Sequence, residues 1–238
     1  MKLLSSPAHD IVKHWSRLQK DRKYRQSEGR VLVEGKNLLK DLLLKHTPVR
    51  VAMTERHSDA LAGEEAYLIS DAIAEKISSV ETPEGCFAEF EIPKPSATPD
   101  LNRVVILDRL QDPGNVGTLL RTCVGFAIHT VLLIEPCCDI WNPKCLRSAK
   151  GAQFDLAILS TSWERLPPVG PLLVADTEGN DVRTIQRPSR FALVLGNEAR
   201  GSLLPPGLPS SAIAIPMPGP MESLNVAQAG AILLFALL

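Results

Sequence analysis

The chain has 238 residues, of which 45% are hydrophobic and 22% charged, and its formal net charge is −1. These values are typical of folded globular proteins, so they exclude a disordered chain and leave room for one large domain or two small ones. The apolar runs are shorter than the ~20 residues of a bilayer span, and the first residues meet charges too soon for a signal peptide. The sequence therefore predicts a soluble cytoplasmic protein that does not enter a membrane.

The first half of the chain predicts a small α/β domain, residues 1–92. Ile11, Trp15 and Leu18 recur at helical spacing, which indicates a short amphipathic helix with basic residues on its outer face. We expect Ser70 or Asp71 to cap a later helix that runs to Ile77. The other segments are expected as strands at 29–35, 49–55, 66–70 and 86–92 and a helix at 36–46.

Positive charge is concentrated near the beginning of the chain. From Ile11 to Lys40, nine basic residues stand against three acidic ones, a local net charge of +6. This distribution favours a surface that faces a polyanion, although on charge alone a solvated helix face explains it equally well. The candidate residues of this surface are Lys13, Arg17, Lys20, Arg22, Lys23 and Arg25.

A segment with three prolines, residues 93–100, predicts a linker to a second domain, residues 101–238. In the second domain, runs of Val, Ile and Leu alternate with helices at 114–126 and 143–150, and a last helix starts at Ser223. Such alternation is typical of a mostly parallel sheet covered on both faces. The strands are expected at 103–108, 130–135, 155–160, 171–177, 191–196 and 211–217.

The five cysteines predict reduced thiols and no metal site. Their number is odd, and neither a C-x-x-C pair nor a histidine at zinc spacing accompanies them. They are Cys86, Cys123, Cys137, Cys138 and Cys145.

The loop after strand 103–108 is well placed for a ligand, because parallel α/β sheets bind ligands beyond the carboxyl ends of their strands. Its glycines, Gly114 and Gly117, do not complete the dinucleotide pattern G-x-G-x-x-G, and the chain has no P-loop. The pattern therefore supports neither an NAD site nor a P-loop phosphate site, and it argues against a Rossmann-type dehydrogenase or methyltransferase.

The same loop carries the pattern N-x-G-x-x-x-R from Asn115 to Arg121. Asp112 or Asn115 can cap the following helix, so a structural role explains most of the loop. It does not explain Arg121, because we expect its neighbours Leu120 and Val124 to face the core. An arginine beside a core is costly unless it meets an anion or an oxygen ligand.

Two more polar loops follow strands of the same sheet. Residues 196–201, GNEARG, place a carboxylate between two glycines directly after a strand. Residues 218–226, PGPMESLNV, form a stiff proline-rich loop, and Ser223 is the expected N-cap of the last helix. Three polar loops at the strand ends of one sheet predict a site more firmly than any one of them does.

Three patterns follow one another along the chain: N-x-G-x-x-x-R, L-G-N-E-A-R-G and I-P-M-P-G-P-M-E-S-L-N-V. In this order they resemble the three motifs of the SpoU (TrmH-like) family. This family comprises S-adenosylmethionine-dependent RNA ribose 2′-O-methyltransferases of the SPOUT superfamily. Residues 146–158 and the N-terminal half also resemble the family, so the likeness covers essentially the whole chain. It implies a C-terminal SPOUT domain with a deep trefoil knot, a small N-terminal α/β RNA-binding domain, and a homodimer that brings motifs of both subunits together.

The resemblance also implies site residues, position by position. Arg121 would hydrogen-bond the ribose hydroxyl or a neighbouring phosphate and stabilise alkoxide charge, since a guanidinium with a pKa of about 12 or more is a poor base. Asn115 and Asn225 would orient that arginine or the ribose. Glu198 would pair with Arg121 or shape its loop, and Ser223 would touch substrate or cofactor. The implied cofactor contacts are Gly196, Ile215, Leu224, Thr177 and Gly179.

The N-terminal domain favours ribosomal RNA as the substrate, by analogy with the family. The alternatives are a tRNA ribose methyltransferase and a homologue that binds RNA but has lost catalysis. The five candidate catalytic residues are all present, which argues against the inactive homologue. The chain ends at Leu238 within the helix that builds the family's dimer interface, so the dimer is predicted less firmly than the chemistry.

Overall fold

A computed structural model describes residues 1–57, 65–94, 98–197 and 201–238. The chain divides into two compact units, Met1–Pro93 with Trp141–Arg147, and Lys94–Ile140 with Ser148–Leu238. The domain boundaries and the linker expected from the sequence stay predictions. Over the described ranges, no helix combines the length and the hydropathy that a membrane span requires.

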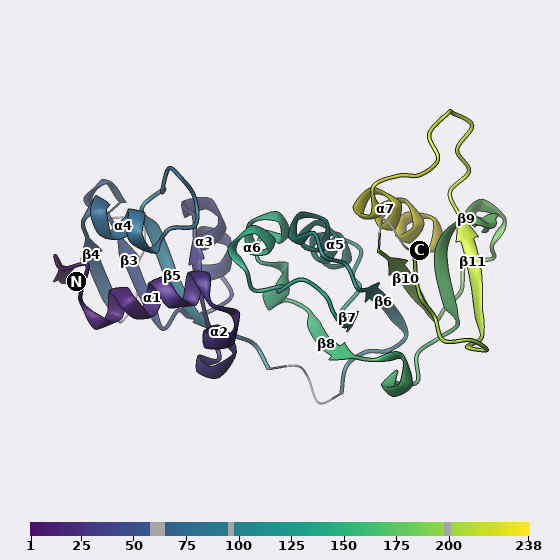
Figure 1. The fold of residues 1–238 in the computed structure, drawn as a ribbon, viewed down its shortest axis with the longest axis horizontal. Helices are drawn as coiled ribbons and strands as arrows, with labels where there is room; N and C mark the ends of the chain where they lie inside the picture. Colours follow the sequence, from purple (N-terminus) through teal and green to yellow (C-terminus); the bar gives the residue numbers. More distant parts are fainter. Residues whose placement is uncertain (58–64, 95–97, 198–200) are drawn as a thin grey trace. The chain divides into compact units, whose positions relative to one another are not determined.

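The N-terminal unit is built on a five-stranded mixed sheet of order β1-β4-β3-β5-β2 (Figure 1). Strands β1 and β3 run parallel to β4, whereas β5 is antiparallel to β3 and β2. The elements are β1 (Lys2–Leu4), α1 (Asp10–Lys20), α2 (Arg22–Glu28), β2 (Arg30–Glu34), α3 (Lys36–Leu43), β3 (Arg50–Met53), β4 (Ala66–Ile69), α4 (Asp71–Ile77) and β5 (Cys86–Glu91). The sequence reading missed β1 and α2, which are a three-residue edge strand and a seven-residue helix.

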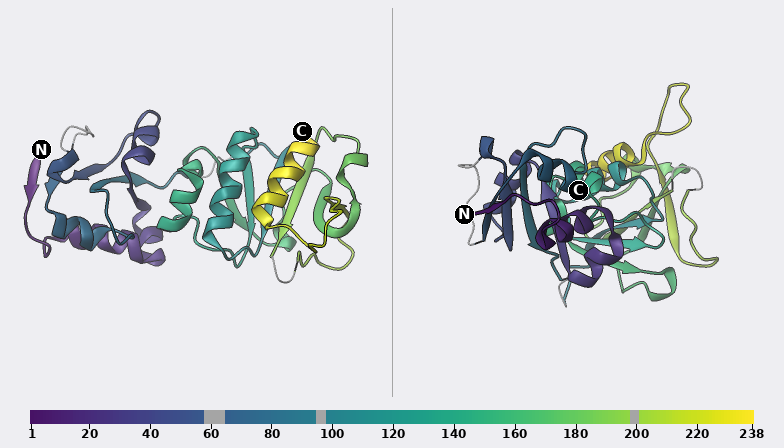
Figure 2. Two further views of the ribbon diagram at one scale, coloured as in Figure 1. Left: turned by 90° about the horizontal axis from the view of Figure 1, so that it is seen from above. Right: turned by 60° about the vertical axis from the view of Figure 1, so that its left-hand side comes forward.

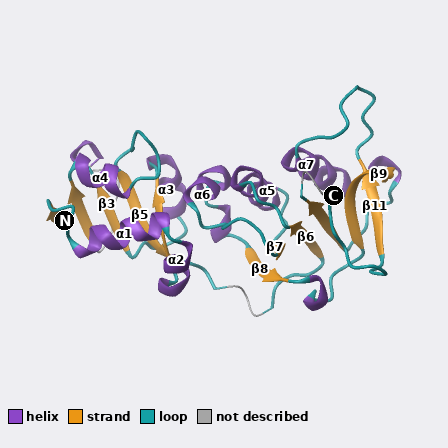
Figure 3. Ribbon diagram, in the orientation of Figure 1, coloured by secondary structure: helices purple, strands orange, loops and turns teal. Residues whose placement is uncertain are grey.

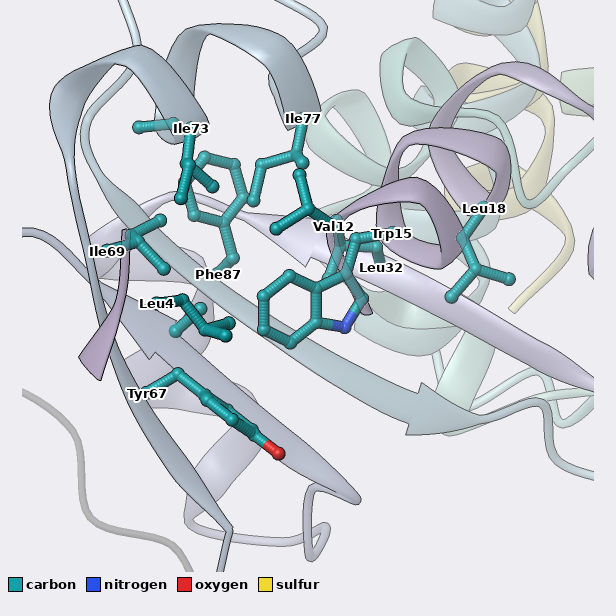
Figure 4. Close-up of a cluster of buried hydrophobic side chains, with 12 residues drawn as sticks. Leu4, Val12, Trp15, Leu18, Leu32, Tyr67, Ile69, Ile73, Ile77 and Phe87 are labelled. Carbon is teal, nitrogen blue, oxygen red and sulfur yellow. The ribbon is translucent and has the colours of Figure 1, made fainter. Parts of the chain in front are cut away.

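The amphipathic first helix packs on this sheet as its pattern indicated. Val12, Trp15 and Leu18 are fully or almost fully buried, and they meet Tyr67 of β4 and Phe87 of β5 in one cluster (Figure 4). The centroids of the Trp15 and Tyr67 rings are 5.6 Å apart, and the rings meet edge to face, a geometry that aromatic pairs favour.

Arg25 does not lie on the predicted basic surface. Its side chain is only 3% exposed, and Nη1 donates to the carbonyl oxygens of Leu18 (2.5 Å) and Gln19 (3.1 Å). These carbonyls belong to the last turn of α1, whose acceptors lack partners within the helix. The expectation that Arg25 contacts RNA is therefore wrong, because the arginine caps a helix inside the unit.

The second unit contains a six-stranded sheet, and each pair of neighbouring strands is parallel (Figure 3). The strand order is β11-β9-β10-β6-β7-β8. The elements of this half of the chain are β6 (Arg103–Asp108), α5 (Pro113–Gly125), β7 (Thr130–Ile134), α6 (Pro143–Ala149), β8 (Ala157–Thr161), β9 (Leu172–Asp181), β10 (Phe191–Gly196), β11 (Ser210–Ala214) and α7 (Val226–Leu237). Most of α6 belongs to the first unit. The predicted α/β class with a mostly parallel sheet is confirmed, and the knot stays a prediction.

Helices α5 and α7 lie side by side on one face of this sheet (Figure 2). Alternate strand residues on the opposite face pack against loops and the short 3₁₀ helix η3 (Trp163–Arg165), where Trp163, Leu166 and Leu208 cover Ile106 and Val194. The sheet is thus covered on both faces: helices α5 and α7 cover one face, and loops with η3 cover the other.

Val124 was expected to face the core beside Arg121, yet it is 37% exposed and Arg121 is exposed as well. The cost of burying an arginine therefore does not arise at this position. Arg121 is therefore not placed beside the core as expected, and the motif alone points to its role.

Candidate cofactor and active site

A cavity of about 490 Å³ lies at the carboxyl ends of β10 and β11, beside the middle of β9. This is the edge at which parallel α/β sheets bind ligands, and the volume falls within the ~300–1,000 Å³ of small-molecule sites. Its lining consists of Ala175, Asp176, Thr177, Leu195, Gly196, Asn197, Gly201, Ile213, Ile215, Met217, Ser223, Leu224, Asn225, Val226, Ala229 and Leu233.

The lining combines apolar walls with a few polar groups. Ile213, Leu224 and Leu233 offer surfaces suited to a flat aromatic base, whereas the carboxylate of Asp176 and the amide of Asn197 can bind hydroxyl or ammonium groups. Together these groups match the chemistry of an adenosine that carries a cationic sulfur. The residues present therefore fit S-adenosylmethionine.

Four of the five predicted cofactor contacts, Gly196, Ile215, Leu224 and Thr177, line this cavity. The fifth, Gly179, lines the neighbouring hollow formed by the third-motif loop, not the cavity itself. A Cβ at Gly179 would lie 2.5 Å from the backbone nitrogen of Ile213, so close packing of β9 against β11 accounts for this glycine.

Gly196 is required by the path of the chain that follows it. A Cβ there would collide with the backbone of Gly201 and Ser202, much closer than real Cβ contacts. The chain leaves β10 at Gly196 and returns over it, and the N–H of Gly201 donates to the carbonyl of Asn197 (2.8 Å). This close return forms one wall of the cavity.

Asparagines of the first and third motifs meet beside the cavity. Asn225 Nδ2 donates to Asn115 Oδ1 over 2.9 Å, although 110 positions separate the residues. Asn225 Oδ1 accepts the Ala227 N–H (2.9 Å), so Asn225 is the N-cap of α7, and Asp112 caps α5 by accepting the Asn115 N–H (2.9 Å). The expectation that Ser223 caps the last helix is wrong, since the helix begins three residues later.

A buried ion pair at the end of β6 holds the second-motif loop. Asp108 is fully buried and accepts both Nε and Nη2 of Arg109, each at 2.8 Å. The backbone N–H of Leu203 donates to the same carboxylate (2.8 Å), and the Arg109 carbonyl accepts Asn197 Nδ2 (3.3 Å). Asn197 at the start of the loop and Leu203 just after it are therefore anchored on two adjacent residues.

Arg109 has an unusual backbone in this arrangement. Its φ of +56° is left-handed, which is uncommon outside glycine, and its N–H donates to the Ile134 carbonyl (3.0 Å). The hydrogen bonds and charge of Asp108 raise the pKa of Arg109. We call Asp108 and Arg109 the strand-end clamp.

Sequence reasoning missed this clamp and Asp176. A faint signal existed for each, because both aspartates end an apolar strand run in the sequence. The decisive partner of Asp108, the Leu203 N–H, is a backbone group 95 positions away that no side-chain pattern marks.

Arg121 lies elsewhere on the same unit. It is exposed on α5, is not among the residues that line the cavity, and its side chain makes no hydrogen bond or ion pair to another described residue. Ser223 is also exposed, at the cavity wall. Glu198 lies outside the described residues. Within one subunit the structure thus brings together Asn115, Asn225 and Ser223, but not Arg121.

The remaining candidates for the basic surface are exposed on α1 and α2 of the N-terminal unit. They are Lys13, Arg17, Lys20, Arg22 and Lys23. Among the described residues, no group of three or more His, Cys, Asp or Glu side chains could hold a metal ion.

The parallel sheet with a nucleoside-sized cavity at its strand ends defines an α/β domain that binds a nucleoside cofactor. Residues 102–235 match the SpoU rRNA Methylase family, and residues 9–88 match the MRM3-like substrate binding domain. The first match covers more than half of the chain, so the chain belongs to the SpoU rRNA methylase family.

Individual relatives agree with this assignment. The chain is 30% identical to the 23S rRNA (guanosine(2553)-2′-O)-methyltransferase RlmP of Bacillus subtilis, over 100% of this chain and 99% of that protein. It is 32% identical to the human mitochondrial rRNA methyltransferase 3, over 67% of this chain and 43% of that protein. The AdoMet-bound rRNA methyltransferase from Sinorhizobium meliloti superposes with a TM-score of 0.82 at 26% identity, covering 99% of this chain and 97% of that chain.

The predicted class is confirmed: the chain is an RNA 2′-O-methyltransferase of this family, and its cofactor is S-adenosylmethionine.

Proposed function

We propose that this protein methylates a ribose 2′-hydroxyl in ribosomal RNA. The observation that carries the proposal is the cavity at the ends of β10 and β11, with the Asn115–Asn225 pair beside it, in a chain of the SpoU family. The Bacillus and human relatives are both named as rRNA methyltransferases, which supports this RNA class. The match of residues 9–88 to a substrate-binding domain adds to it.

In this proposal the cavity residues hold the cofactor. Gly196, Ile215 and Leu224 contact it mainly through the backbone, Thr177 lies at the rim, and Asp176 binds polar hydrogens. When bound, S-adenosylmethionine supplies an electrophilic methyl group on a sulfonium. The protein must then place the ribose oxygen in line with that methyl group and stabilise the loss of its proton.

Arg121 stabilises the negative charge that develops on the ribose oxygen. A guanidinium is a poor base, so Arg121 acts by hydrogen bonding to the oxygen or to the adjacent phosphate. Asn115 and Asn225, joined by their 2.9 Å hydrogen bond, fix the approach to the cavity. Ser223 touches substrate or cofactor, and Glu198 pairs with Arg121 or shapes its loop.

The active unit in this proposal is a homodimer. Arg121 is exposed and does not line the cavity of its own subunit, so a second copy that supplies an arginine would complete the site. On the neighbouring helix, Ile232 and Phe235 are 43% and 69% exposed, which is apolar surface suited to an interface. A cytoplasmic location, where ribosomal RNA is found in bacteria, fits the same proposal.

The basic residues of α1 and α2 supply affinity through phosphate contacts, so RNA binding should weaken steeply with added salt. Mapping ribose methylation across the ribosomal RNA and tRNA of cells with and without this protein identifies the substrate. The first position to inspect is the 23S guanosine named for the Bacillus relative. A lost methyl group in tRNA alone would overturn the choice of ribosomal RNA.

The role of Arg121 is tested by Arg121→Ala. The variant should bind S-adenosylhomocysteine with unchanged affinity in calorimetry but lose methyl transfer by about a hundredfold or more, the scale for one charge-stabilising donor. Full retained activity would exclude the assignment. Arg147→Ala, which removes an arginine from α6, serves as the control.

A further inference from the structure

Three basic side chains form a stripe along the outer face of α1. Lys13, Arg17 and Lys20 are spaced at i, i+4 and i+7, and all three are exposed. Residues at this spacing lie on one face of a helix, about 10 Å from end to end. Lys13 also meets Asp10 (3.0 Å), but that pair is highly exposed and so weak. We call Lys13, Arg17 and Lys20 the basic stripe.

The middle residue of the stripe is held in a defined position. The guanidinium carbon of Arg17 lies 3.6 Å from the centre of the Tyr24 ring on α2, so the two planar groups are in contact. Arg17 makes no ion pair with a carboxylate among the described residues. One face of the guanidinium is therefore occupied by the tyrosine, and the exposed remainder is available to a ligand.

Tyr24 is in turn anchored to the interior. Its hydroxyl lies 2.8 Å from Nδ1 of His14, and Nε2 of His14 lies 3.2 Å from Oε1 of Glu89, which is fully buried. A carboxylate only accepts, so His14 Nε2 donates to Glu89, and the other ring nitrogen, Nδ1, is hydrogen-bonded to the tyrosine hydroxyl. Trp15 Nε1 (2.9 Å) fixes the same carboxylate.

We propose that Arg17, backed by Tyr24, is a stacking platform for one unpaired base of the RNA substrate, with Lys13 and Lys20 binding the phosphates on either side. A guanidinium plane and an aromatic ring are the surfaces on which proteins stack splayed bases, and single-stranded segments supply such bases. The inference rests on the proposed function and narrows it, because the N-terminal unit would then select single-stranded over duplex RNA.

The alternative for an exposed basic stripe is contact with phosphates alone. Such contact needs only charge, and it gains nothing from the arginine being planar or from the anchor through Tyr24 and His14. Preorganisation lowers the entropy lost on binding, and the hydrogen-bonded chain from Glu89 to Tyr24 provides it. The geometry thus favours stacking over a purely electrostatic patch.

The test compares variants of the full chain, saturated with S-adenosylhomocysteine, by fluorescence anisotropy. The probes are a labelled unstructured RNA of about 12 nucleotides, within the range of single-stranded sites, and the same RNA annealed to its complement. Arg17→Lys keeps the charge and loses the plane. Lys20→Ala removes a charge from the stripe, and Lys40→Ala removes one from α3 as the matched control.

Arg17→Lys should weaken binding of the single strand about tenfold and binding of the duplex less than about twofold, because duplex bases are already stacked. Tyr24→Phe keeps the ring but cuts the anchor, and should weaken the single strand about two- to threefold. Lys20→Ala should weaken both probes alike and lower the salt slope by about one, whereas Lys40→Ala should change little.

Equal affinities of the Arg17→Lys variant and the wild type for the single strand would overturn the stacking platform and leave the proposed function standing. Equal losses on both probes would also overturn it, because they indicate phosphate contact only. If the wild-type chain bound neither probe, the RNA-binding role of the N-terminal unit would fall as well.

Discussion

The strand-end clamp gives a quantitative prediction through the substitution Asp108→Asn. The wild-type carboxylate is fully buried and accepts three N–H groups at 2.8 Å, two from Arg109 and one from the backbone of Leu203. An asparagine of nearly the same shape keeps one oxygen and replaces the other with an NH₂ group. That NH₂ group must face either the Leu203 N–H or an N–H of Arg109, which places donor against donor.

The expected loss of stability follows from these contacts. Hydrogen bonds to a charged group contribute about 1.5–3 kcal/mol each, and breaking a buried ion pair from one side costs about 3–5 kcal/mol. The side chain of Arg109 is 24% exposed, so water can partly replace its lost partner. We therefore expect Asp108→Asn to lower the free energy of unfolding by about 2–3 kcal/mol.

The substitution should also reach the cofactor. Asn197, which lines the cavity, donates to the Arg109 carbonyl, so a loosened Arg109 releases one cavity wall. We expect the affinity for S-adenosylhomocysteine to fall several-fold, with a larger effect on the KM for S-adenosylmethionine than on kcat. Asparagine cannot restore these contacts. If Asp108 merely filled space, the Asp108→Asn change would be tolerated.

Urea unfolding followed by circular dichroism measures the loss, and the transition of the C-terminal unit is the one that S-adenosylhomocysteine shifts upward. The matched control is Asp181→Asn, which alters a surface pair with Arg183 whose side chains are 28% and 72% exposed. That change should cost less than about 1 kcal/mol. A loss below about 0.5 kcal/mol for Asp108→Asn, with unchanged cofactor affinity, would refute the clamp.

Three further changes test other parts of the molecule. Burial alone would raise the pKa of Glu89, but hydrogen bonds led by His14 and Trp15 hold it at about 2, against a usual value of 4.5. Glu89 thus adds about 3 kcal/mol of stability above pH ~4.5 that is lost as the pH falls toward ~2, and in acid unfolding curves Glu89→Gln should flatten this loss. Gly196→Ala should abolish S-adenosylhomocysteine binding in calorimetry because its Cβ meets the Gly201 and Ser202 backbone, whereas Gly125→Ala, in open space, should bind normally. In thermal unfolding, Arg25→Ala should lower the free energy of unfolding of the N-terminal unit by about 1–3 kcal/mol. A loss as small as that caused by Lys23→Ala would contradict the capping role of Arg25.

The strands and the mostly parallel character of their sheet were predictable because the signal of each strand is local. Runs such as the one ending at Asp108 bury both faces and read as continuous apolar stretches, so their bounds agree with the structure to within a few residues. The exception is β9, which continues to Asp181 through a polar second half that no apolar run indicates. Pairing with β11 sustains it there: Asn180 and Asp181 pair with Ile213 and Ala214, which lie 33 positions later.

The misread residues depend on contacts that the sequence does not display. Arg25 looks like its exposed neighbours Arg22 and Lys23, yet the turn at Asp21 directs it back to the carbonyls of α1. Ser223 is as good a cap in isolation as Asn225, so propensity alone could not choose between them. The residue that caps α7 is selected by a tertiary hydrogen bond, the one between Asn225 and Asn115.

That hydrogen bond explains why asparagine stands at position 225. The start of α7 needs a side-chain acceptor for the Ala227 N–H, and Asn115 Oδ1 needs a donor. Serine has too short a side chain to serve both partners, and an ionised aspartate accepts but cannot donate. Only the amide caps the last helix with its oxygen and joins the first motif with its nitrogen. The first and third motifs are therefore locked together at the cavity before any ligand arrives, so the arginine six residues further along α5 is carried on a fixed helix.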